Sequence, residues 1–99
     1  MKTLTAGDRI HIHSDAGEAP LDVDGRLEYI HGADEPPPLP GFAFDIAKAR
    51  QACQDLEITN VLWISYEMSV LGTVVFLALQ LSDGRYIDLH GHQLQLTPA

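Results

Sequence analysis

Apolar and polar residues alternate with a period of two along much of this chain, and that pattern predicts β-strands. Five segments carry it, at approximately 9–13, 21–30, 60–67, 73–81 and 85–90. Successive side chains of a strand point to opposite faces. The first segment therefore turns Ile10 and Ile12 inward and Arg9, His11 and His13 outward.

The second segment alternates over its whole length. Its predicted inner face holds Leu21, Val23, Leu27 and Tyr29, and its outer face holds Asp22, Asp24, Arg26 and Glu28. Asp24-Gly25 is compatible with either a turn or a glycine inside one strand. A two-residue turn there would pair apolar with polar residues, so we favour a single strand that is weakest at Gly25.

The stretch from Asn60 to Leu89 is the most apolar part of the chain and predicts the core sheet. A three-residue loop, Ser82-Asp83-Gly84, places the leucines of 73–81 on the same face as Ile87 and Leu89. We therefore expect a type I turn followed by Gly84 at positive φ. The predicted core face is Val75, Leu77, Leu79, Ile87 and Leu89.

A second apolar patch on these strands exceeds what one helix can cover. It consists of Val61, Trp63, Val74 and Phe76. Exposed patches of this kind mark interaction sites. We therefore expect a protein partner or a homodimer contact at these four residues.

One helix is predicted at approximately 42–55. Apolar residues recur there at spacings of four, three, four and three, as on one helical stripe: Phe42, Ile46, Ala49, Cys53 and Leu56. The proline-rich segment 31–41 precedes it and predicts a stiff connector, with a proline-motif ligand as the alternative. After the strands, Leu94 and Leu96 suggest a last short strand that pairs with the N-terminal one.

Together these elements predict an α+β fold in a single domain, 1–99. An antiparallel sheet of about five strands would carry the helix on one face. No span of about 20 apolar residues is present, so we expect no transmembrane segment.

The amino-acid composition restricts the classes of partner that the chain can bind. Fourteen acidic residues against six basic ones give a net charge of −8, which disfavours direct nucleic-acid binding and anionic membranes. A nucleic-acid mimic that occupies a basic partner is the sharper alternative. Cys53 is the only cysteine, so no internal disulfide can form, and we expect a cytoplasmic protein.

Four of the five histidines form two His-x-His pairs, His11/His13 and His90/His92. Residues i and i+2 of a strand lie on one face, a geometry that suits two ligands of one metal. Asp15 or Asp88 would complete such a site. The simpler interpretation is exposed histidines without metal.

Two short resemblances to known families add enzyme hypotheses. His11-Ile12-His13-Ser14-Asp15 resembles the first motif of the polymerase-and-histidinol-phosphatase hydrolases and, more loosely, the metallo-β-lactamase motif. Leu27–Gly32 followed by Leu39-Pro40-Gly41-Phe42 resembles macrolide-binding peptidyl-prolyl isomerases. That second resemblance implies a proline pocket lined by Tyr29, Leu39 and Phe42.

The favoured hypothesis is a small, acidic, non-catalytic interaction or regulatory module of a bacterial-type cytosol. The sequence assigns no catalytic residue, no metal ligand and no cofactor. The alternatives are a histidine-rich metal protein or enzyme, and then a prolyl-isomerase-like domain.

Overall fold

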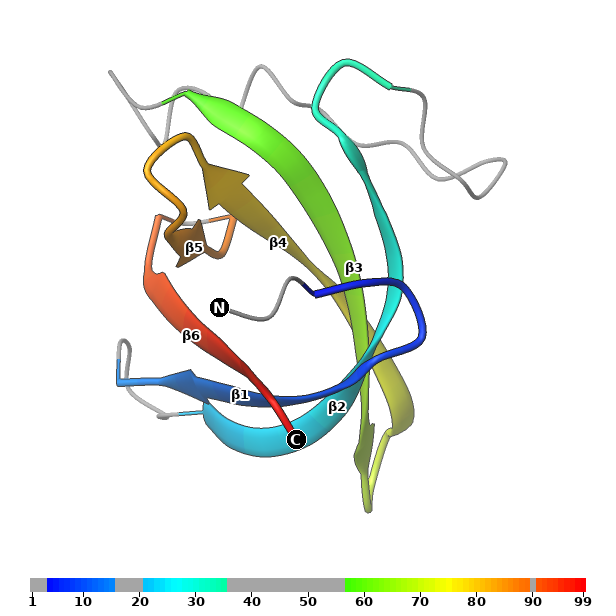
Figure 1. Cartoon of the computed structure of the whole chain (residues 1–99). Helices are drawn as coiled ribbons and strands as arrows, with labels where there is room; N and C mark the ends of the chain where they lie inside the picture. Colours follow the sequence, from blue (N-terminus) through cyan, green and yellow to red (C-terminus); the bar gives the residue numbers. More distant parts are fainter. Residues whose placement is uncertain (1–3, 16–20, 36–56, 90) are drawn as a thin grey trace.

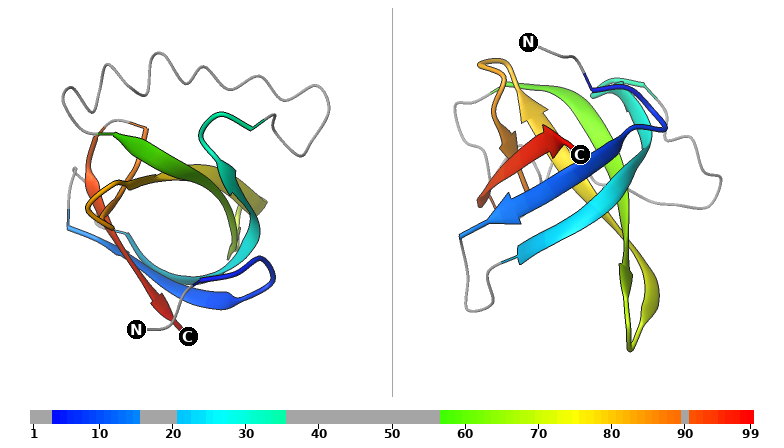
Figure 2. Two further views of the ribbon diagram at one scale, coloured as in Figure 1. Left: turned by 45° about the horizontal axis from the view of Figure 1, so that its top comes forward. Right: turned by 60° about the horizontal axis from the view of Figure 1, so that its bottom comes forward.

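The protein is a closed antiparallel β-barrel. The computed structural model describes residues 4–15, 21–35, 57–89 and 91–99. Its strands are β1 (Arg9–Ser14), β2 (Leu21–Gly32), β3 (Ile58–Met68), β4 (Gly72–Leu81), β5 (Tyr86–Ile87) and β6 (Gln93–Pro98). Each strand pairs with the next, and β6 returns to pair with β1 (Figure 1). Figure 2 shows the resulting ring of strands.

The predicted α+β class is therefore wrong for the described part of the chain, which is an all-β barrel without a helix. The prediction assumed an open sheet with a helix on one face. The sheet instead coils until its first and last strands pair, which closes the barrel. The helix predicted at 42–55 and the connector residues 36–41 lie outside the described residues. Those described residues contain no helix long and apolar enough to cross a membrane.

Strand β2 confirms the prediction of one continuous strand through Asp24-Gly25. It pairs with β1 through residues 21–26 and with β3 through residues 25–32. It also continues through His31 and Gly32, which had been assigned to the connector. The pairing register shifts between Leu27 and Tyr29, so Glu28 is an extra residue in a β-bulge.

The bulge corrects one predicted side-chain direction. Beyond it the alternation is inverted, so Ile30 packs against the barrel core and Tyr29 is exposed.

The turn between β4 and β5 confirms the predicted three-residue loop. Leu79 lies opposite Ile87, and Gly84 has a φ of +92°. The Gly84 amide donates to the Leu81 carbonyl at 2.9 Å. Strand β5 nevertheless ends at Ile87, short of the predicted boundary, and Leu89 is exposed.

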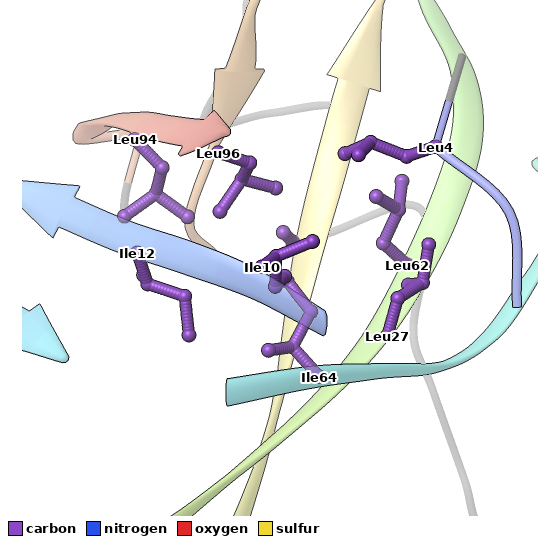
Figure 3. Packing of buried hydrophobic residues seen from close by; sticks show 9 residues of the cluster. Leu4, Ile10, Ile12, Leu27, Leu62, Ile64, Leu94 and Leu96 are labelled. Atoms are coloured by element: carbon purple, nitrogen blue, oxygen red, sulfur yellow. The ribbon is translucent and has the colours of Figure 1, made fainter. Parts of the chain in front are cut away.

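The main core fills the barrel interior. Its buried members come from β1, β2, β3, β4, β6 and the segment before β1 (Figure 3): Leu4, Ile10, Ile12, Leu27, Leu62, Ile64, Ala78, Leu94 and Leu96. This corrects the predicted core face, because the barrel is filled by the opposite face of β3 and β4. Leu79 and Ile87 do belong to a second buried cluster, whereas Val75 is 49% exposed.

Candidate interaction surface

The four residues predicted as one partner patch lie on two faces of the sheet. Trp63 is paired with Leu77, whereas Phe76 is paired with Ile64. Directly opposed residues of an antiparallel pair share a face, so Val61 and Trp63 face away from Val74 and Phe76. Val61 and Trp63 are also fully buried in the second cluster. A patch made of all four residues therefore does not exist.

Trp63 is held by a histidine that sequence reasoning had not connected with it. Its indole N–H donates to Nε2 of His31 at 2.9 Å, while Nδ1 of His31 lies 2.9 Å from the Gly32 carbonyl. A ring that accepts at Nε2 and donates at Nδ1 is the neutral tautomer. His31 thus links the end of β2 to the middle of β3.

The outer face of β1 and β2 carries a network of histidines and carboxylates. Nδ1 of His11 lies 2.7 Å from Asp24, and its Nε2 lies 2.5 Å from Asp22. Both ring nitrogens therefore donate when the imidazole is protonated. These hydrogen bonds to Asp24 and Asp22 raise the pKa of His11 above its ordinary value.

A raised pKa in the folded state makes stability depend on pH. The contribution of His11 is fully present below its unfolded-state pKa, about 6.5, and is lost as the pH rises through the folded-state value. We expect the melting temperature of wild type to exceed that of His11→Gln by more at pH 5.5 than at pH 9. Thermal melts of both proteins at constant ionic strength measure this. Parallel pH profiles would contradict it.

The other predicted metal ligands are not brought together into one site. His13 lies 2.9 Å from Asp15, and His92 lies 3.4 Å from Asp88. His90 lies outside the described residues. Within the described ranges, no group of three histidine, cysteine, aspartate or glutamate side chains has a geometry that could hold a metal.

The hydrolase and isomerase resemblances find no site among the described residues. His11 and His13 of the first motif are engaged with carboxylates. Tyr29 of the proposed proline pocket projects outward at 39% exposure. Leu39 and Phe42 lie outside the described part, so the pocket itself remains a prediction.

The exposed apex of the β3–β4 hairpin is the feature that the sequence prediction missed, although the two strands and the Met68–Gly72 link were expected. It extends beyond the barrel, and its turn is the lowest point of the molecule in Figure 1. Met68 pairs with Gly72 across a three-residue loop. Val70 and Leu71 form the apex and are 88% and 70% exposed. Turns normally carry glycine, proline, asparagine, aspartate or serine, so an apolar pair at this turn was the available signal.

One edge of this hairpin is open. Strand β4 pairs with β3 along its whole length, but β5 covers only Leu79 and Gln80 on the other side. Residues 72–78 have no strand partner there among the described residues. Proteins usually protect such edges with charges, prolines or bulges. The segment Gly72–Leu81 contains no charged residue and no proline.

Comparisons with protein-family models, with curated proteins and with solved structures find no match to this chain.

Proposed function

We propose that this protein is a non-catalytic interaction module that binds an extended segment of another protein along the open edge of β4. The observation that carries the proposal is the exposed apolar apex, Val70 and Leu71, at the end of a projecting hairpin. These two side chains contribute nothing to the barrel core.

The geometry supports strand addition as the mode of binding. In that mode, backbone hydrogen bonds along a free edge supply affinity, and alternate side chains supply specificity. Among the residues that the structure describes, the edge at residues 72–78 has no strand partner, so its backbone groups are available for strand addition. Val75 projects from the outer face and is half exposed, while Val74 and Phe76 of the predicted patch lie on the inner face of the same strand.

The chemistry of the edge indicates the chemistry of the partner. A strand without charges for ten residues is complementary to an uncharged segment rich in β-branched residues. A net charge of −8 on each copy disfavours pairing of two copies of this chain. We therefore favour a different protein as the occupant over a homodimer.

A displayed library of random extended peptides provides the test, with wild type as bait and Val75→Lys as the counter-selection. A lysine on an edge strand blocks further strand pairing. We expect the selected peptides to be apolar and β-branched, and to lose binding at least about tenfold to Val75→Lys. In hydrogen exchange, they should protect the amides of residues 73–78.

Leu89→Ser is the matched control, because Leu89 is exposed to a similar degree but lies off the hairpin. It should bind the selected peptides as wild type does. Equal binding to wild type and Val75→Lys would refute the proposal. Self-association of wild type that Val75→Lys abolishes would identify a second copy as the occupant and refute a heterologous partner.

We also propose a cellular compartment for this interaction module. A chain with one cysteine needs no oxidising environment to fold. This supports a cytoplasmic location.

A further inference from the structure

Two arginines lie directly opposite each other on the outer face of the barrel. Arg9 of β1 is the pairing partner of Arg26 of β2, and both side chains are exposed. Like charges in directly opposed positions destabilise an antiparallel pair. The placement is notable in an acidic chain, in which Arg9, Arg26 and Arg85 are the basic residues of the described part.

Neither guanidinium is neutralised by a described carboxylate. Arg85 pairs with Asp83, with 2.6 Å between Nε and Oδ2, whereas Arg9 and Arg26 form no ion pair with any described residue. Guanidinium groups bind carboxylates and phosphates through two parallel hydrogen bonds. The pair thus retains its donors for a ligand.

The two arginines line a pocket of about 750 Å³ where the barrel wall meets the β3–β4 hairpin. Its other wall includes Ser65, Tyr66 and Thr73. A volume of this size falls within the range that holds small molecules.

Three acidic side chains also line this pocket, and each is engaged by a partner other than arginine. Asp24 accepts from His11 at 2.7 Å, Glu28 from Ser65 at 2.7 Å, and Glu67 from Thr73 at 2.7 Å. These interactions hold the carboxylates at fixed positions around the arginine pair. These three carboxylates repel anions, and they would repel a polyphosphate backbone more strongly than a single oxyanion held by both arginines.

We propose that Arg9 and Arg26 form a binding site for a small oxyanion, a phosphate or carboxylate group of a metabolite-sized ligand. Each guanidinium donates to a pair of oxygens, so the ligand bridges β1 and β2. This site lies on the outer face of the barrel, and of its lining only Thr73 belongs to the edge of β4.

Titrations with sodium phosphate and with sodium succinate test the site and distinguish the two anion types. Sodium chloride at matched ionic strength is the reference. The readout is the NMR signal of each arginine Nε–H, assigned through arginine variants. We expect saturable shifts at Arg9 and Arg26 in at least one of the two titrations, and none at Arg85, which is the internal control.

Substitutions then separate binding from folding. Arg9→Gln and Arg26→Gln should each weaken binding by about tenfold or more. Their melting temperatures in the absence of ligand should equal or exceed that of wild type, because each substitution removes the repulsion between two like charges. Arg26→Lys keeps the positive charge but loses the planar guanidinium. Its affinity for the anion should lie between those of wild type and Arg26→Gln. Shifts that chloride reproduces, shifts at Arg85 of equal size, or no saturable shift with either anion would each overturn the proposal.

Discussion

Gly25→Ala is expected to lower the free energy of unfolding by about 3 kcal/mol, and Gly25→Val by more. A Cβ atom at this position would lie 2.5 Å from the Ser65 carbonyl oxygen and 2.8 Å from Cδ1 of Ile12. Both distances are far below van der Waals contact, and the first involves backbone that cannot turn aside. Urea denaturation of the variants measures the loss.

Gly84→Ala is the control that separates crowding from backbone strain. Gly84 has a positive φ, but a Cβ there would meet no atom within 4 Å. Only the conformational cost of about 1 kcal/mol should appear. Equal losses in the Gly25→Ala and Gly84→Ala variants would show that the close approach of β2 to β3 is not what requires glycine at position 25.

Trp63→Ala is expected to cost about 3–5 kcal/mol of stability, as for other fully buried aromatic residues. Trp63 is 1% exposed and packs in the second cluster. A surface residue that served only to contact a partner would change the free energy of unfolding by about 0.5 kcal/mol or less. Urea denaturation followed by circular dichroism distinguishes these outcomes, because it does not depend on indole fluorescence.

The hydrogen bond to His31 accounts for part of that cost. His31→Leu removes the acceptor of the Trp63 N–H and should cost about 1–3 kcal/mol. His31→Gln offers a side-chain oxygen in the same region and should recover part of it. Trp63 is the only tryptophan of the chain, so its fluorescence reports directly on this contact. Identical losses for the two variants would argue against the hydrogen bond.

Much of the local structure followed from the alternation of side chains. The single strand through Gly25, the three-residue turn ending at Gly84 and the pairing of the last strand with the first were all predicted correctly. The first two depend on which residues share a face, and that information is present in a strand's own sequence. The third was expected because terminal segments are ordered when they are tied to a sheet.

Closure of the barrel was not predictable in the same way. An open sheet and a closed one have the same alternation, and closure depends on how strongly the strands coil. Glycine at position 25 permits β2 to approach β3 closely while it pairs with β1. From the sequence alone, Gly25 predicted only a local weakening of the strand and not its close approach to β3.

The bulge and the hairpin apex were missed for two different reasons. Tyr29 and Ile30 are both apolar, so an extra residue before them leaves no visible break in the pattern. Val70 and Leu71 stand shortly before the apolar strand of residues 74–79, and their exposure depends on the turn between Met68 and Gly72. The candidate interaction surface therefore depends on the projection of the hairpin beyond the barrel, which the alternation of side chains does not encode.

The pairing of β1 with β6 has a consequence for the order of folding. Ile10 lies opposite Pro98, so the barrel closes through residues from almost opposite ends of the chain. On the ribosome, β1 is made first and must wait for β6 before it gains its second neighbour. The β3–β4 hairpin, whose contacts are local in sequence, can form early. We infer that the nascent chain displays the open edge of β4 before the barrel interior is sealed, and is then most prone to aggregate.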